Sequence, residues 1–301
     1  MDLSGPHQAQ PRRALVFGGS GQIGERLLAN LHVAGWQVQA FSRSVRASLP
    51  GLEWQIGDLS HAWTQPAHFG AIFSCGPLDH FARWYAHSSI EAEHVVAFGS
   101  TSIDVKQDSA EAAERDVAGR LRQAEASLFA SAAARSAAAT VLRPTLVYGA
   151  GRDKTLTAIA ALAQRSGFFV LPAGANGLRQ PVHVQDLADA ALAVLAHPAA
   201  AGRAYAVGGG EVLAYSEMVR RTLAALPARP RLLQVPGALF RVAVRMAHLG
   251  GRLGGLNDAV IQRMGQPLVF DPEPARRDFG YAPRPFLPQA EMFTAPALVA
   301  Q

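Results

Sequence analysis

Three glycines recur at intervals of three residues in the segment LVFGGSGQIG, at Gly18, Gly21 and Gly24. A short apolar run at 14–17 precedes the turn and apolar residues at helical spacing follow it, as expected for a strand, a turn and a helix. Glycines in such a turn let the backbone bend tightly and approach a diphosphate, and the helix N-terminus offers that group free N–H donors. The segment therefore predicts a dinucleotide site, against the alternative of a glycine-rich turn that binds nothing.

The segment FGSTSIDVK is the second place where residue types suggest chemistry. It carries three hydroxyl residues ahead of Lys106: Ser100, Thr101 and Ser102. Only two of the 28 basic residues in the chain are lysines, Lys106 and Lys154. A partly desolvated lysine can give or take a proton near neutral pH, which an arginine does not do. Two interpretations of Lys106 stay open: a proton-transfer residue, or a solvated loop residue.

The elements that position these segments follow from the alternation of two patterns. Short apolar runs, each suited to a buried strand, occur at 14–17, 36–41, 71–74, 94–98 and 140–144. Helical patterns separate them, and the longest, rich in alanine, glutamate and arginine, spans roughly 109–135. This alternation predicts an α/β fold with a Rossmann-type, doubly wound parallel sheet that is covered by helices on both faces.

The alternation loosens after Tyr148, where proline, short helical patterns and glycine-rich loops become more frequent. We therefore expect two domains. A dinucleotide-binding Rossmann domain should comprise 12–150 and 184–207, and a smaller substrate-binding cap should comprise 151–183 and 208–301.

The composition indicates a globular protein of a reducing compartment. Hydrophobic residues make up 49% of the chain and charged residues 17%, too apolar for a disordered polymer. No run of about 18 apolar residues occurs, and the first 13 residues lack the apolar core of a secretion signal. A lone cysteine, Cys75, cannot form an internal disulfide. We therefore expect a cytoplasmic protein without a membrane span.

The charge pattern bears on the partners. The pI is about 9.9, but the net charge is only +5, and the basic residues stand singly or in pairs without a groove-reading motif. Nucleic acid is therefore not the expected partner. The ten histidines show no paired spacing typical of a metal site, so no metal is expected either. The expected partner is a small-molecule substrate, and the sequence leaves open whether the chain forms a homodimer.

Four segments together resemble the extended short-chain dehydrogenase/reductase superfamily, in its NAD-dependent epimerase/dehydratase group. They are LVFGGSGQIG, VLRPTLVYGAGRD, RQPVHVQDLADA and FDPEPARRDFGYAPRPF. The similarity runs over nearly the whole chain. It implies a Rossmann domain followed by a C-terminal substrate domain, and often a nucleotide-sugar substrate.

The resemblance also implies a set of cofactor-binding residues. They comprise the turn, the adenine contact and the ribose contacts: Gly18, Ser20, Gly21, Gln22, Ile23, Gly24, Asp58, Gly76 and Pro77. An NAD-specific site usually has an acidic residue at the end of the second strand, whereas this chain has Ser42 followed by Arg43. A serine removes repulsion and a guanidinium can bind a 2′-phosphate. We therefore predict NADP(H) in preference to NAD(H), with a solvated loop arginine as the alternative.

The resemblance breaks at the catalytic helix. GSTS matches the family's strand-five signature, with Thr101 as the residue that hydrogen-bonds the reacting oxygen. A tyrosine and, four residues later, a lysine should follow on the next helix. The best local match, AGRLR, puts Ala118 and Arg122 at these two positions, and a shift of one residue puts Val117 and Leu121 there. Neither register supplies a phenol, so Arg122 is a predicted cofactor contact without a catalytic partner.

Two functions from different classes remain. The first is an NAD(P)-dependent oxidoreductase or epimerase acting on a carbonyl or alcohol carbon, with a nucleotide sugar as one candidate substrate and with Thr101 and Lys106 as the catalytic residues. The substrate contacts implied by the resemblance are Ser102, Tyr148 and Arg179. Arg179 would hold a substrate diphosphate or, alternatively, close the cap through a salt bridge. The second function is a non-catalytic NADP(H)-binding regulator or assembly factor.

Overall fold

The computed structural model describes residues 12–60, 67–240 and 263–294, which form two compact units. Apart from the gaps, unit 1 comprises 12–143, 188–205 and 277–280, and unit 2 comprises 144–187, 206–276 and 281–294. Each unit has an apolar core of its own. Within the described residues no helix is long and apolar enough to cross a bilayer.

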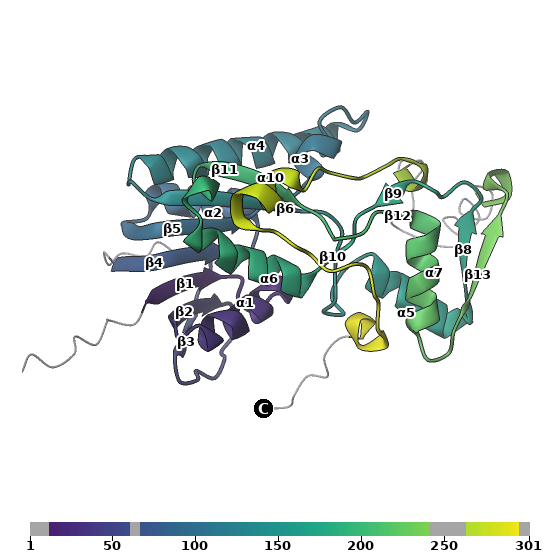
Figure 1. Ribbon diagram of the computed structural model, residues 1–301, viewed down its shortest axis with the longest axis horizontal. Coiled ribbons are helices and arrows are strands. Elements are labelled where there is room, and N and C mark those ends of the chain that lie inside the picture. The colour runs from purple at the N-terminus through teal and green to yellow at the C-terminus, as the bar shows by residue number, and fades with distance from the viewer. Residues whose placement is uncertain (1–11, 61–66, 241–262, 295–301) are drawn as a thin grey trace, which may run out of the picture. The chain divides into compact units, whose positions relative to one another are not determined.

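A seven-stranded sheet with the order β11-β6-β5-β4-β1-β2-β3 is the frame of unit 1 (Figure 1). Its strands are β1 (Arg13–Phe17), β2 (Gln37–Ser42), β3 (Leu52–Ile56), β4 (Ala67–Ser74), β5 (Ile90–Phe98), β6 (Ala138–Pro144) and β11 (Arg203–Val207). The pairs from β6 to β3 are all parallel. The strand order reverses between β1 and β4, so their carboxyl ends flank the switch point at which such sheets bind ligands. The predicted Rossmann-type, doubly wound fold is confirmed.

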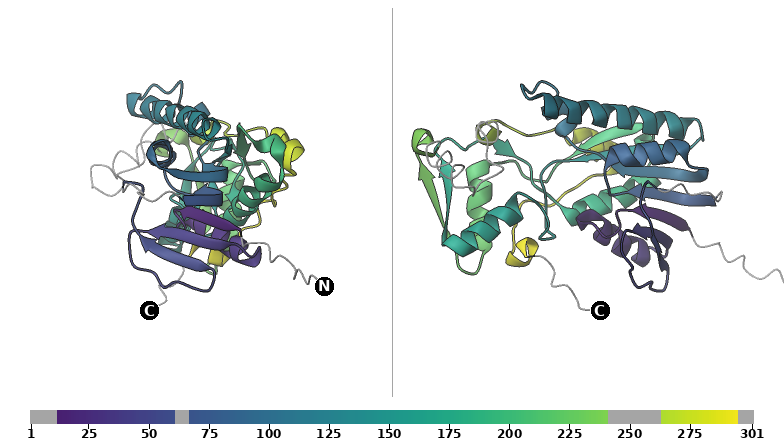
Figure 2. Two further views of the ribbon diagram at one scale, coloured as in Figure 1. Left: turned by 90° about the vertical axis from the view of Figure 1, so that its left-hand side faces the viewer. Right: turned by 180° about the vertical axis from the view of Figure 1, so that it is seen from behind.

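Helices cover both faces of this sheet. They are α1 (Gln22–Val33), α2 (Leu78–His87), α3 (Ser102–Val105) and α4 (Ala112–Ala133). α2 and α4 lie together on one face and α1 on the other (Figures 1 and 2). Successive residues of a strand face opposite sides, so Leu15 and Phe17 of β1 join Phe81 and Leu128 in the core beneath α2 and α4.

Unit 2 consists of short two-stranded sheets and helices. The paired strands are β7 (Val147–Tyr148) with β10 (Val182–His183), β9 (Leu178–Arg179) with β12 (Leu213–Ala214), and β8 (Phe168–Pro172) with β13 (Arg231–Val235). Its helices are α5 (Leu156–Ser166) and α7 (Tyr215–Ala225), while α6 (Val184–Ala193) and α10 (Glu273–Phe279) each cross from one unit into the other. Tyr148, Leu156, Met218 and Phe286 are central to its core.

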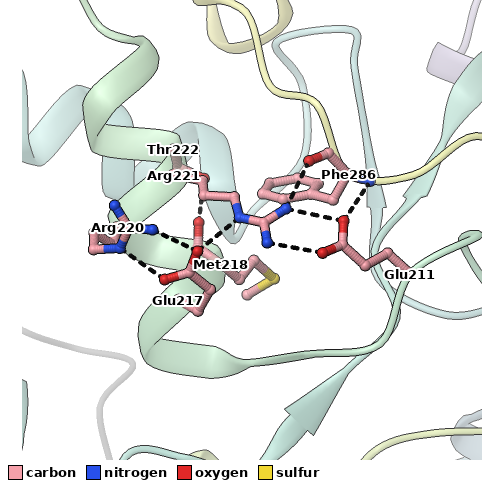
Figure 3. A network of polar contacts seen from close by, with 7 residues as sticks. All are labelled: Glu211, Glu217, Met218, Arg220, Arg221, Thr222 and Phe286. Carbon is pink, nitrogen blue, oxygen red and sulfur yellow. Dashed lines mark hydrogen bonds and ion pairs between the residues drawn. The ribbon is translucent and has the colours of Figure 1, made fainter.

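A polar network connects Glu211 and the chain at Phe286 to α7 in unit 2 (Figure 3). Arg221 binds the Glu211 carboxylate through both terminal nitrogens, at 2.9 and 2.8 Å, and donates from Nε to Glu217 at 2.7 Å. Its Nη1 also donates to the Phe286 carbonyl, and the Phe286 N–H donates to Glu211. These bonds hold the Phe286 ring in the core, where it meets Tyr148 edge to face at 4.9 Å.

Candidate cofactor and active site

The turn between β1 and α1 requires glycine for two different steric reasons. Gly18 has a φ of +72°, and a Cβ there would lie 2.9 Å from the carbonyl carbon of Cys75. A Cβ on Gly24 would lie 2.2 Å from the Gly18 oxygen, so the helix could not close against the turn. Gly21 precedes α1 and makes no side-chain cap. The first N–H groups of the helix are therefore open to an anionic ligand.

The other predicted turn residues line the same start of α1. Ser20 and Gln22 are half-buried, and Ile23 is buried. The Gln22 Oε1 atom is buried and has no hydrogen-bond partner among the described residues. A buried acceptor without a donor costs free energy unless a ligand or water supplies one. The turn therefore has both the shape and a polar atom suited to a bound nucleotide.

The residues predicted to favour NADP over NAD lie at the carboxyl end of β2. Ser42 is buried, and its Oγ accepts the Ser44 N–H at 3.3 Å. Arg43 is exposed, and within the described residues its guanidinium forms no ion pair. After β3, the Asp58 carboxylate accepts hydrogen bonds from the backbone and hydroxyl of Ser60, which order the turn. Among the described residues, the end of β2 is therefore followed directly by the Arg43 guanidinium and not by a carboxylate.

A cavity of about 260 Å³ lies where β4 and β5 end and α4 passes over them. Gly76, Pro77 and Ser100 line one part of it, and Val117 and Leu121 of α4 line another. At its rim Arg120 forms an ion pair with Asp79 at 3.2 Å. The predicted ribose contacts, Gly76 and Pro77, therefore share one hollow with the hydroxyl signature after β5.

The two predicted catalytic residues bracket the short helix α3. Thr101 is its N-cap residue and is 8% exposed. Lys106 ends the helix, and its side chain, 26% exposed, lies 3.7 Å from the Glu114 carboxylate. Ser109 Oγ donates to the same carboxylate at 2.7 Å. The Lys106 side chain is therefore partly buried beside the Glu114 carboxylate.

None of the five tyrosines stands in for the missing phenol of α4. They lie on other elements: Tyr85 on α2, Tyr148 on β7, Tyr205 on β11, Tyr215 on α7 and Tyr281 after α10. Burial raises the pKa of every one of these phenols. A phenol with a raised pKa is a poor proton acceptor at neutral pH.

Comparisons with known proteins found similar sequences. The model of the NAD dependent epimerase/dehydratase family matches residues 122–208. A 2-alkyl-3-oxoalkanoate reductase of Stenotrophomonas maltophilia (strain K279a) is 28% identical, over 90% of this chain and 95% of its own. A UDP-glucose 4-epimerase of Vibrio cholerae is also 28% identical, over 64% of this chain and 57% of its own. Residues 122–208 of the chain are thus similar to the NAD-dependent epimerase/dehydratase family.

Solved structures share the fold of this chain. MoeE5, in complex with UDP-glucose and NAD, superimposes with a TM-score of 0.65 at 18% identity and covers 93% of this chain and 96% of its own. A UDP-galactose 4-epimerase has a TM-score of 0.65 at 15% identity and covers 94% and 96%. At such low identity these likenesses concern the fold alone.

The structure distinguishes the two registers of α4, Val117 with Leu121 and Ala118 with Arg122. Val117 and Leu121 line the cavity, whereas Ala118 is fully buried beside them in the core. Arg122 lies away from the cavity lining and donates to the Ile103 carbonyl at 3.2 Å and to the Gln107 side chain. The local sequence match had favoured Ala118 and Arg122. The packing instead presents an aliphatic pair to the cavity, and a cofactor contact by Arg122 stays a prediction.

The predicted substrate residues are Ser102, at the start of α3, and Tyr148 and Arg179 in unit 2. Tyr148 is buried, and burial raises its pKa to about 12. Arg179 is 5% exposed and donates to three backbone carbonyls, those of Leu178 at 2.8 Å, Gln266 at 2.7 Å and Arg263 at 2.6 Å. Its guanidinium also lies over the Tyr215 ring. The role of Arg179 in substrate binding stays a prediction, and so do the roles of Ser102 and Tyr148.

No group of three or more potential metal ligands occurs within the described residues. His183, in the segment RQPVHVQDLADA, packs against the backbone. A Cβ on Gly149 would lie 2.4 Å from its ring, and its Nδ1 accepts the Gln185 N–H at 3.1 Å. His183 is thus held by packing and a backbone hydrogen bond.

Proposed function

We propose that unit 1 binds a nicotinamide dinucleotide, with NADP(H) preferred to NAD(H), and that the chain uses it to reduce or epimerise a carbonyl or alcohol carbon. The observation that carries this proposal is the turn after β1. It tolerates no side chain at Gly18 or Gly24 and leaves the start of α1 open. Such a turn accommodates a diphosphate closely against the backbone.

The residues that would hold the dinucleotide are distributed along the carboxyl end of the sheet. The turn would hold the diphosphate, Arg43 the 2′-phosphate and Asp58 the adenine side. Gly76 and Pro77 would lie at the nicotinamide ribose. The bound nicotinamide supplies or accepts hydride, and the protein must supply the proton and hold the substrate.

We assign proton transfer to Lys106 and the hydrogen bond to the reacting oxygen to Thr101. The Lys106 amine, which lies 3.7 Å from the Glu114 carboxylate, would act as the proton donor. Donation suits the reduction of a carbonyl, in which the oxygen gains a proton as the carbon gains hydride. The proposed direction is therefore reduction with NADPH, and a dependence on NADPH fits a cytoplasmic protein. Assembly as a homodimer stays a prediction.

Two substrate classes follow from the relatives, whose names specify a 2-alkyl-3-oxoalkanoate and a UDP-sugar. A substrate diphosphate would need Arg179 to leave the three carbonyls that it now binds. A 3-oxo acid has a ketone and no diphosphate, so its binding would not require Arg179 to leave these carbonyls. We therefore propose a ketone of the 3-oxo acid class first, and a nucleotide sugar second.

The competing proposal is a dinucleotide-binding regulator without catalysis. The observation that favours it is the aliphatic pair Val117 and Leu121, which faces the cavity where family members carry a phenol and an ammonium. A regulator needs the cofactor site but no proton donor.

The decisive experiment measures binding and turnover on the same preparation. Calorimetry with NADPH tests the cofactor site. NADPH oxidation with a series of 2-alkyl-3-oxo acids, and formation of UDP-galactose from UDP-glucose, test the two substrate classes. Turnover that Thr101→Val abolishes supports the enzyme. Binding without turnover of either class supports the regulator, and absence of binding refutes both proposals.

A further inference from the structure

The indole of Trp54, on β3, links the cofactor turn to a second arginine. A Cβ on Gly19 would lie 3.2 Å from Trp54 Cη2, so the indole packs directly against the turn. On the same indole rests the Arg46 guanidinium, whose Cζ is 5.3 Å from the ring centroid. Arg46 is thereby held beside the turn, although nothing in its own sequence neighbourhood marks it as a ligand-binding residue.

The loop that carries Arg46 also carries Arg43, and it is anchored at several points. Ser44 N–H donates to Ser42 Oγ at its start. Trp54 N–H donates to Ser48 Oγ at 3.1 Å, which draws the loop back along β3. Leu49 and Leu52 exchange backbone hydrogen bonds of 2.9 and 2.8 Å at its end. Two guanidinium groups are thus presented from one anchored loop next to the end of β2.

Stacking on an indole leaves a guanidinium able to bind an anion. The cation–π contact uses the face of the planar group, whereas its N–H donors point outward along the edge. Neither Arg43 nor Arg46 forms an ion pair with a carboxylate in the part of the chain that the structure describes. A phosphate monoester carries between one and two negative charges at neutral pH and accepts several such donors.

We propose that Arg46 is a second binding residue for the 2′-phosphate of NADP(H), positioned by Trp54, and that it shares with Arg43 the discrimination against NAD(H). This inference rests on the proposed dinucleotide site. It names a residue that the glycine turn and the end of β2 do not reveal, because Arg46 reaches the site through an indole on the neighbouring strand.

The chain offers a matched control for the test. Arg12 lies over the Trp36 ring at the same distance, 5.3 Å to the centroid, but it lies before β1, where the amino ends of the strands are. Affinities for NADPH, NADH and 2′,5′-ADP would be measured by calorimetry for the parent, Arg46→Ala, Arg46→Lys and Arg12→Ala. We expect Arg46→Ala to weaken NADPH and 2′,5′-ADP at least about fivefold and NADH by less than about twofold. Arg12→Ala should change none of them, and Arg46→Lys should be intermediate.

Two results would overturn the inference alone, and a third would show that the dinucleotide site itself fails. If the parent prefers NADPH and Arg46→Ala leaves that preference unchanged, Arg46 is not a phosphate ligand. If Arg46→Ala weakens NADPH and NADH equally, it only orders the loop. If the parent binds neither nucleotide, the proposed function fails with it. Should Arg46→Ala not fold, Trp54→Leu removes the platform, and the inference requires the same selective loss of NADPH.

Discussion

The Glu125 carboxylate and the Arg143 guanidinium form a largely buried ion pair that joins α4 to β6. Arg143 Nε donates to Glu125 Oε1 at 2.8 Å, and Nη2 donates to Oε2. These hydrogen bonds raise the pKa of Arg143. Leu121 stands four residues before Glu125 on the same helix, and Val117 four residues before Leu121. Residues at this spacing share a helix face, so the pair fixes the rotation that turns Val117 and Leu121 toward the cavity.

Breaking this pair should destabilise unit 1 strongly. Glu125→Ala would leave the Arg143 charge half-buried without its main partner, and we expect a loss of about 3 kcal/mol in the free energy of unfolding. The control is Asp116→Ala, which removes an exposed ion pair with Arg120 on the same helix and should cost less than about 0.5 kcal/mol. Urea unfolding measures both. Equal losses in the two variants would mean that the buried pair does not hold α4 in place.

Restoring a phenol and an ammonium on α4 should raise the rate of ketone reduction. Val117→Tyr with Leu121→Lys places a phenol and an ammonium on the helix face that lines the cavity. A positioned proton donor is worth about a hundredfold or more, so we expect NADPH-dependent ketone reduction to rise at least about tenfold. The matched control, Ala118→Tyr with Arg122→Lys, puts a ring where Ala118 is fully buried and should lower stability without any gain in rate. An unchanged rate in the first variant would place the reacting oxygen elsewhere.

Removing the proposed proton donor should lower turnover and spare binding. Lys106→Met keeps the length of the side chain but removes the charge that Glu114 holds. We expect the rate of reduction to fall at least about a hundredfold while the NADPH affinity stays within a few-fold. Lys154→Met, at the only other lysine of the chain, is the control and should behave like the parent. Normal turnover by Lys106→Met would exclude Lys106 as the acid.

Truncating Arg179 should affect stability more than ligand binding. Burial lowers the pKa of Arg179, yet two of its three hydrogen bonds to backbone carbonyls hold β9 to the 263–266 segment. Losing charge-assisted bonds of this kind should cost about 3 kcal/mol in Arg179→Ala. Arg165→Ala, at an exposed position of α5, should cost almost nothing. Thermal unfolding compares the two variants. A stable Arg179→Ala protein with weakened UDP-sugar binding would instead support the substrate clamp.

Much of the fold could be predicted because its signals are local. The apolar runs at 36–41 and 94–98 fall within or beside β2 and β5, and the helical pattern at 109–135 contains α4 (Ala112–Ala133). The edge strand β3 was missed, since none of its residues is buried and its sequence, LEWQI, contains no continuous apolar run. The glycine turn could also be predicted, because its signal is local in the sequence. Gly18 and Gly24 are required by contacts within a few residues of chain and with the adjoining strand end.

The orientation of α4 and the partners of the arginines were decided only by tertiary structure. A shift of one residue rotates a helical position by about 100°, so the sequence alone left Ala118 and Val117 as rivals for one place. The ion pair between Arg143, on β6, and Glu125 fixes which of the two residues faces the cavity. Arg179 donates to the carbonyls of Arg263 and Gln266, more than 80 residues away in the sequence. Arg46 lies over the Trp54 indole on the next strand. The sequence by itself determined where the chain bends and which faces are apolar, because these depend on neighbouring residues. Folding determines which partners each polar side chain meets. Only the tertiary structure therefore decides which polar side chains remain free to bind a ligand.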